Sequence, residues 1–321
     1  MTLNIAVTGA SGFVGKALLP LLANAGHRVS ILVRNPDATV FGDGIRVITG
    51  GLQDVFALQS LTQNADVVVH IAGVISGIRR ADFMSANFEG TVALVKEAKA
   101  SGVKRFVYIS SLAARQPSLS AYGESKAAAE QALLEMAGEM EVCIIRPAAI
   151  YGPGDKATLP LLQILMSRVA FIPGAAEAKF AMIHVEDVAR ALSDAVRGPT
   201  GIFELHDGAS SHSWQEMLRI SRQHFGTPNY IYYIPKALAL GVGHMGDAVA
   251  KLRNRATLVN SSQIRQIYHA DWCVKGTSWP LKNSILLQDG LPQTIRWYQA
   301  QGLLPQHHVG DRSTADSGTA G

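Results

Sequence analysis

The sequence contains few cysteines and no paired metal ligands. Its 321 residues include two cysteines, Cys143 and Cys273, and two isolated thiols form neither a disulfide framework nor a zinc site. The histidines show no paired spacing with a supporting carboxylate, so we expect no bound metal. The scarcity of cysteine is typical of a reducing compartment, and we therefore expect a cytoplasmic protein.

Segments that insert into membranes or concentrate positive charge are also missing. The N-terminal apolar run is too short for a signal peptide. The most apolar later stretch, residues 230–249, contains Pro235, Lys236, His244 and Asp247, which make it a poor membrane span. Lysine and arginine are scattered along the chain, whereas nucleic-acid-binding proteins cluster them. We therefore expect neither a membrane nor a nucleic acid as a partner.

The overall composition is that of a globular protein with a small excess of positive charge. Hydrophobic residues make up 48% of the chain and charged residues 17%, which permits a sizeable core and excludes global disorder. The formal net charge of +4 fits an enzyme whose cofactor or substrate is an anion.

The first half alternates short β-branched runs with helical patterns. Strands are predicted at residues 3–8, 28–33, 46–49, 67–70, 105–110 and 142–146, with helices between them at 15–25, 56–63, 86–100 and 125–136. Strands that alternate with helices imply right-handed crossovers. We therefore predict an α/β fold, a doubly wound parallel Rossmann sheet.

The second half is less regular and suggests a smaller C-terminal substrate lobe. We assign residues 1–152 to the dinucleotide-binding Rossmann domain. Residues 153–305 are expected to complete the sheet and build the small substrate-binding lobe. Residues 306–321 contain almost nothing apolar, so we predict a disordered tail there.

A glycine-rich loop follows the first predicted strand and opens the first helix. Gly9, Gly12 and Gly15 have the spacing G-x-x-G-x-x-G. The first glycine permits a tight turn, the second lets a pyrophosphate approach the backbone, and the third lets helix pack on strand. An ordinary strand-to-helix turn is the alternative. We predict a phosphate-binding loop made of Gly9, Ser11, Gly12, Phe13, Val14 and Gly15, at the positively polarised end of a helix.

The end of the second predicted strand indicates which dinucleotide binds. An NAD enzyme usually has an acid there for the ribose 2′-hydroxyl, but this chain has Arg34 and no acid. Arg34 can pair with a 2′-phosphate, although a solvated surface arginine is the alternative reading. We therefore predict NADP(H) as the preferred cofactor, with NAD(H) as the alternative.

A Tyr-x-x-x-Lys spacing occurs at Tyr122 and Lys126. Residues four apart share a helix face, so the phenol and the ammonium can meet one cofactor ribose. The lysine charge would lower the pKa of the phenol and let it act as a general acid or base. Ser110 and Ser111 end the preceding strand at its carboxyl side, where doubly wound sheets bind ligands. We therefore predict a catalytic group of Tyr122, Lys126 and one of these two serines, and an exposed helix start is the alternative.

Together these motifs resemble the extended short-chain dehydrogenase/reductase family, which includes nucleotide-sugar epimerases and dehydratases. The resemblance covers residues 3–200 and continues more loosely to about residue 304. It rests on the glycine loop, Tyr122 and Lys126, and the segments 69–73, 87–91, 108–111, 146–154 and 184–189.

The resemblance also implies that Ser111, rather than Ser110, is the catalytic serine, so that the predicted catalytic group is Ser111, Tyr122 and Lys126. It further implies other contacts with the cofactor and an assembly of two chains. Ile71, Ala72 and Gly73 would line the cofactor, Asn87 would support it, and Pro147 and Ile150 would border the nicotinamide. The family often has an acid for the adenine near residues 50–52, where this chain leaves only backbone contacts around Leu52. The resemblance further implies a homodimer, formed through the helices predicted at 86–100 and 125–136.

Two departures from the nucleotide-sugar enzymes concern the substrate. Ala149 stands where those enzymes commonly have a substrate-binding asparagine, and the segment between Ser111 and Tyr122 is short. We therefore predict an NADP(H)-dependent oxidoreductase that transfers a hydride to or from a small carbonyl or alcohol. The alternatives are a nucleotide-sugar epimerase or dehydratase, and a non-catalytic scaffold that binds NADPH.

Overall fold

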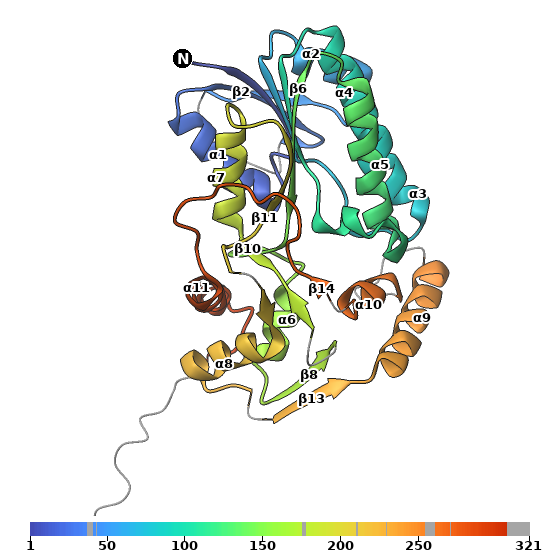
Figure 1. Cartoon of the computed structure of the whole chain (residues 1–321), viewed down its shortest axis with the longest axis vertical. Coiled ribbons are helices and arrows are strands. Elements are labelled where there is room, and N and C mark those ends of the chain that lie inside the picture. The colour runs from blue at the N-terminus through green and yellow to red at the C-terminus, as the bar shows by residue number, and fades with distance from the viewer. Residues whose placement is uncertain are drawn as a thin grey trace, which may run out of the picture.

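A computed structural model describes most of the chain, with a sheet-containing body above a smaller lobe (Figure 1). The described residues are 1–36, 41–42, 44–174, 178–209, 211–228, 230–253, 261–269 and 271–306. The predicted disordered tail lies outside the described residues from 307 onward.

Seven parallel strands form the central sheet, in the order β11-β6-β5-β4-β1-β2-β3. They are β1 (Asn4–Thr8), β2 (Arg28–Val33), β3 (Arg46–Thr49), β4 (Val67–His70), β5 (Arg105–Ile109), β6 (Glu141–Pro147) and β11 (Gly201–Leu205). The strand order reverses between β1 and β4, so the loops after these two strands diverge and leave room for a ligand. This topology confirms the predicted doubly wound Rossmann sheet.

Helices cover both faces of the sheet, which explains its continuous apolar strands (Figure 1). One face packs on α1 (Phe13–Asn24) and α7 (Val185–Ala195). The other face packs on α2 (Val55–Thr62), α4 (Gly90–Ala100) and α5 (Ala121–Met136). Every residue of β4 and β5 is buried as a result. The homodimer expected through α4 and α5 stays a prediction.

Two predicted helices differ from the structure in ways that affect the site. The helix predicted at 86–100 is divided into a π-helical segment, η2 (Met84–Glu89), and α4. The helix predicted at 125–136 already begins at Ala121, because the Ser120 hydroxyl accepts a hydrogen bond from Gly123 N–H at 3.0 Å and caps it. Tyr122 therefore lies inside the first turn of α5.

Short helices connect the strands near their carboxyl ends. They are α3 (Arg80–Phe83) after β4, and the 3₁₀ turns η3 (Leu112–Arg115) and η4 (Pro117–Leu119) between β5 and α5. All three segments contact α5, so compact structure lies between this helix and the carboxyl ends of β4 and β5.

The lobe below the sheet has its own apolar core. It contains α6 (Leu159–Leu165), α8 (Trp214–Phe225) and α11 (Leu287–Ala300), together with a parallel ribbon of β8 (Val169–Pro173) and β13 (Tyr230–Ile234). Small pairings link it to the body: β7 (Ala149–Tyr151) with β10 (Met182–His184), and β9 (Lys179–Phe180) with β12 (His212–Ser213) and β14 (Asp271–Trp272). At its outer edge stand α9 (Lys236–Arg253) and α10 (Ser261–Ile267). Within the described residues, no helix combines the length and apolar character needed to cross a membrane.

A buried histidine connects the carboxyl ends of β1 and β4. His70 Nδ1 lies 2.6 Å from the Thr8 hydroxyl oxygen, and its Nε2 lies 2.9 Å from the Thr91 hydroxyl oxygen. Burial, with a smaller contribution from the Lys126 charge, lowers the pKa of His70 to about 3. The ring is therefore neutral at physiological pH, and each of its nitrogens has a hydroxyl partner.

We predict that His70 makes the protein lose stability as the pH falls. Between pH 6.5 and about 3 the unfolded chain binds a proton that the folded chain does not, so the free energy of unfolding declines with decreasing pH. At pH 5 this contribution is about 2 kcal/mol. His70→Gln should flatten the pH dependence measured by urea denaturation between pH 7 and 5. The exposed His244 is the control, and equal slopes for His70→Gln and His244→Gln would contradict the assignment.

Candidate active site

The loop between β1 and α1 is held against the loop after β4 by close backbone contact. Gly9 has a φ of 78°, and a Cβ on it would lie 2.5 Å from the backbone nitrogen of Ala72. A Cβ on Gly15 would lie 2.3 Å from the carbonyl oxygen of Gly9. Both distances are too short for real carbon atoms, so these two positions require glycine. Gly12 N–H closes the turn by donating to the Gly9 carbonyl at 3.0 Å.

The surface of this loop fits a pyrophosphate. Ser11 and Gly12 are exposed, and Phe13 is half-buried at the start of α1. Gly12 is the N-cap and supplies no side-chain acceptor, and the first turn of α1 contains no acid. The first N–H groups of α1 are therefore available to an anion. Val14 and Gly15 are buried, so Val14 can contact a cofactor only through its backbone.

Other predicted cofactor residues also follow the carboxyl ends of strands. Arg34 comes directly after β2 and is exposed, and Leu52 is half-buried in the segment after β3. After β4, Ile71 and Ala72 are half-buried and Gly73 is exposed. Because β1, β2, β3 and β4 are parallel, all of these residues lie along one edge of the sheet.

Asn87 fixes the loop after β4 in place. Its side-chain oxygen accepts from Val74 N–H at 2.8 Å, and its amide nitrogen donates to the Val74 carbonyl at 3.0 Å and to the Ser125 hydroxyl at 2.9 Å. Asn87 is buried and so supports the loop from below. Pro147 is buried at the end of β6, and Ile150 is half-buried in β7.

Lys126 joins α5 to the end of β5. Its Nζ donates to the Ile109 carbonyl at 2.9 Å and lies 4.8 Å from the centre of the Tyr108 ring. The side chain is buried, and burial lowers the pKa of Lys126 to about 8, against the opposing charge of Glu130. The ammonium is thus held between α5 and the last residue of β5.

The hydroxyl groups of Ser111, directly after β5, and Tyr122, in the first turn of α5, lie together. Burial raises the pKa of Tyr122, and a hydrogen bond with Ser111 opposes that shift. The expectation that Lys126 lowers the pKa of Tyr122 was wrong for the protein alone, because burial of the phenol has the larger effect and raises its pKa. Ser111 also caps η3 by accepting from Ala113 N–H. The neighbouring Ser110 hydroxyl is buried and has no hydrogen-bond partner among the described residues.

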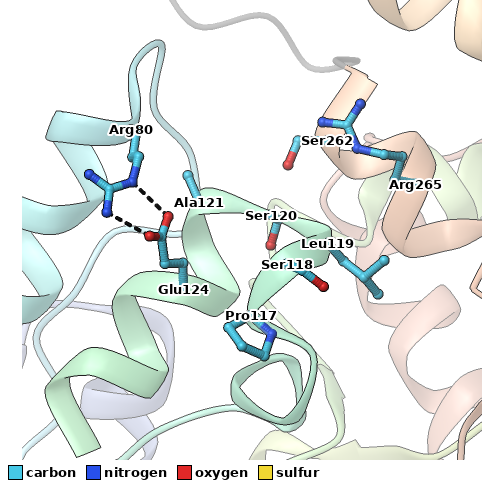
Figure 2. Close-up of a pocket in the computed structure, with 9 residues that line it drawn as sticks. All are labelled: Arg80, Pro117, Ser118, Leu119, Ser120, Ala121, Glu124, Ser262 and Arg265. Atoms are coloured by element: carbon cyan, nitrogen blue, oxygen red, sulfur yellow. Dashed lines mark hydrogen bonds and ion pairs between the residues drawn. The ribbon is translucent and has the colours of Figure 1, made fainter. Parts of the chain in front are cut away.

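A pocket of about 490 Å³ adjoins the first turn of α5 (Figure 2). It lies between that turn, η4 and α10, and Tyr122 is not among its lining residues. On one side Arg80 donates to the Glu124 carboxylate at 2.7 and 2.6 Å. On the other side α10 contributes Ser262 and Arg265. The pocket therefore offers both charged and hydroxyl groups to a ligand at the end of the sheet that carries the glycine loop.

No motif in the sequence predicts these pocket residues. Arg80 lies 44 positions before its partner Glu124, and Arg265 comes from the less regular second half of the chain. Neither arginine belongs to a recognisable motif, so only the fold brings them together. Among the described residues, no three side chains of His, Cys, Asp or Glu gather in a way that could hold a metal ion.

Comparison with known proteins identifies the family to which this arrangement belongs. Residues 5–203 match the NAD dependent epimerase/dehydratase family. The chain belongs to this family. The match covers the glycine loop, Ser111, Tyr122 and Lys126, and it confirms the family predicted from the motifs.

Individual members of the epimerase/dehydratase family resemble the chain over most of its length. A ceramide reductase of Caulobacter vibrioides is 37% identical over 314 residues, which cover 95% of this chain and 97% of that protein. A 4-hydroxy-2-methyl-3-oxo-4-farnesyl-3,4-dihydroquinoline-1-oxide ketoreductase of Stigmatella aurantiaca is 30% identical, covering 76% and 79%. The structure of the Bordetella bronchiseptica enzyme WbmG with NAD and UDP superposes with a TM-score of 0.69, at 19% identity, covering 95% and 96%.

Membership of the epimerase/dehydratase family establishes the general kind of protein. The chain is an NAD(P)-dependent oxidoreductase of this family, and its fold is that of the family's dinucleotide-binding enzymes. The glycine loop, with its uncapped helix N-terminus, is consistent with the binding of such a cofactor.

Two glycine substitutions should separate folding from cofactor binding. Gly15→Ala places a methyl group 2.3 Å from a backbone carbonyl, so we predict a loss of about 1–3 kcal/mol in the free energy of unfolding. A Cβ on the exposed Gly12 would lie 3.2 Å from the carbonyl oxygen of Gly9. Gly12→Ala should therefore lose less stability than Gly15→Ala but weaken NADPH binding at least tenfold, because the methyl group blocks the approach of the pyrophosphate. Urea denaturation and fluorescence titration with NADPH measure the two effects.

Gly42→Ala is the matched control for both substitutions, because no atom lies within 4 Å of a Cβ at that position. It should change neither stability nor cofactor affinity. Normal NADPH binding by Gly12→Ala would contradict the assignment of the loop to the phosphates.

Proposed function

We propose that this enzyme is an NADPH-dependent ketoreductase that acts on a lipid-like substrate. The observation that supports it most is the pairing of the Ser111 and Tyr122 hydroxyls beside the buried Lys126 ammonium. The names of two relatives, a ceramide reductase and a ketoreductase of a farnesylated quinoline, support a hydrophobic ketone as the substrate. The reaction would convert a ketone, NADPH and a proton into an alcohol and NADP⁺.

The protonation state of Tyr122 favours this direction of reaction. Because burial raises its pKa, the phenol holds its proton at neutral pH and can donate it to the carbonyl oxygen of a ketone. The Ser111 hydroxyl can donate a second hydrogen bond to the same oxygen. The phenolate that remains would be stabilised by the nearby Lys126 charge until it regains a proton.

The residues proposed to bind the cofactor lie along the same edge of the sheet. NADPH, when bound, would supply the hydride. The glycine loop and the N-terminus of α1 would hold its pyrophosphate, and the exposed Arg34 after β2 would pair with the 2′-phosphate. Asn87 would keep the loop containing Gly73 in position, because its side chain binds both backbone groups of Val74.

A nucleotide-sugar epimerase is the second candidate, since the similar structure of WbmG contains UDP. Two features of this chain favour the ketoreductase. Ala149 is exposed at the start of β7, and it offers no side-chain hydrogen bond to a polar sugar. The segment from Ser111 to Tyr122 folds into two compact 3₁₀ turns, which leaves no long loop to enclose a sugar.

Tyr122→Phe tests the proposed chemistry. The substrate is a short-chain ceramide whose secondary hydroxyl is replaced by a ketone, and NADPH oxidation is followed by absorbance. We predict turnover by the wild type and a loss of at least ~100-fold in Tyr122→Phe, because general acid catalysis contributes that much, with unchanged NADPH affinity. Tyr298→Phe, in the core of the lobe, should keep its turnover. Wild-type turnover in Tyr122→Phe would refute the role of Tyr122.

Arg34→Ala tests the cofactor preference. We predict tighter binding of NADPH than of NADH by the wild type, and a loss of roughly tenfold to a hundredfold in NADPH affinity in Arg34→Ala, the usual size of a charge-assisted hydrogen bond. Affinity for NADH should stay the same. Arg28→Ala removes an exposed arginine from the opposite end of β2 and should change neither affinity. Equal affinities of the wild type for the two cofactors would contradict the proposal.

A further inference from the structure

A row of large apolar side chains on α9 faces solvent. Leu238, Val242, Met245, Val249 and Leu252 are exposed by 63, 46, 65, 39 and 87%. They are spaced by four, three, four and three positions, which places them on one face of the helix. Large apolar residues in such a row normally face the protein core, so this exposed row indicates a surface that is covered in use.

The inward side of α9 is occupied by small residues. Ala239, Gly243 and Ala250 are buried, and α10 packs against α9. Helix α9 therefore differs from an ordinary surface helix, because small residues occupy its buried positions while five large apolar residues are exposed. The large apolar side chains on its outward face bury little surface within the described fold.

Exposed aromatic rings also lie on β8 and β13, the ribbon that leads into α9. Strand β13 runs directly into α9 at the outer edge of the lobe (Figure 1). Tyr230 and Tyr232 on β13 are each 55% exposed, and Phe171 on β8 is 56% exposed. The rings of Phe171 and Tyr232 stack with their centres 5.7 Å apart. Tyrosine combines an apolar ring with a polar tip, which suits it to the boundary between lipid and water.

The charges of α9 complement an anionic surface. The helix contains Lys236 and Arg253 and a single acid, Asp247. Lys236 and Arg253 are exposed at its two ends. Asp247 is directed toward its own neighbours, because it accepts a hydrogen bond from Ser261 N–H and lies 3.7 Å from His244. The outward face is therefore apolar with positive ends, as in helices that lie on anionic bilayers.

A second copy of the chain is the main competing occupant, because the same spacing is found in coiled coils. Pairing of two such helices would bring their positive charges together and would leave the aromatic rings of β8 and β13 without a partner. A bilayer surface accommodates both the rings and the charges. The observations therefore favour a membrane over a helix of another copy.

We propose that α9 and the β8–β13 ribbon dock on the surface of a bilayer that contains anionic phospholipid. The docking surface consists of Phe171, Tyr230, Tyr232, Leu238, Val242, Met245, Val249 and Leu252. This revises the expectation of no membrane partner, which considered only spanning segments. In so far as it concerns the substrate, the proposal rests on the proposed ketoreductase function. Helix α10 packs on α9 and lines the pocket beside α5, so docking would bring that pocket close to lipid substrates.

Sedimentation with phospholipid vesicles tests the docking surface without cofactor or substrate. The wild type should sediment with vesicles of phosphatidylcholine and phosphatidylglycerol, and less in high salt or with phosphatidylcholine alone. The double variant Met245→Ser/Leu252→Ser should lose at least about tenfold in partitioning, because two large apolar side chains no longer enter the bilayer. Phe56→Ser/Leu303→Ser removes two apolar residues elsewhere that are exposed by 83 and 51%, and this variant should partition like the wild type.

Three results would overturn the proposal: no sedimentation of the wild type, equal losses in both double variants, or a dimer that only Met245→Ser/Leu252→Ser dissociates in light scattering.

The substrate assay separates this proposal from the proposed function. Met245→Ser/Leu252→Ser should reduce a micellar short-chain ketone at the wild-type rate and a vesicle-embedded ketone lipid more slowly. Vesicle binding without any ketone reduction would refute the function and leave the docking surface intact.

Discussion

The hydrogen bond from Lys126 Nζ to the Ile109 carbonyl is the contact on which the candidate site depends. A buried ammonium is unfavourable unless its donors are satisfied, and here a backbone carbonyl, the face of Tyr108 and the charge of Glu130 stabilise it. The bond fixes α5 against the end of β5. The two hydroxyls of Ser111 and Tyr122, one following β5 and the other in the first turn of α5, are brought together as a consequence.

The central sheet could be predicted from the sequence because its strands are buried on both faces. The predicted bounds of β2, β3 and β4 agree with the structure, since continuous β-branched runs bounded by polar residues leave little ambiguity. Helix starts were harder to predict. The start of α5 depends on the Ser120 cap, and the division before α4 depends on a π-helical segment that has no signal in hydrophobic spacing.

The residues of the candidate site can be proposed from the sequence, but the electrostatics around them cannot. A four-residue spacing indicates that Tyr122 and Lys126 share a helix face, but it does not indicate that a carbonyl of β5 binds the ammonium or that burial raises the pKa of Tyr122. The orientation of α9 relative to the rest of the protein could not be predicted either. Residues 230–249 were recognised as apolar, yet the sequence alone did not tell which side of α9 faces the protein, because small inward residues carry no strong pattern.

We propose a net reductase whose cofactor, hydroxyl pair and lipid-facing lobe act together on one ketone. Its most direct test uses NADPH deuterated on the reactive nicotinamide carbon, the ketone form of a short-chain ceramide, and mass spectrometry of the product. The account predicts an alcohol that carries one deuterium, formed together with an equal amount of NADP⁺. A UDP-hexose converted to its epimer without net formation of NADP⁺, together with no labelled alcohol, would contradict it.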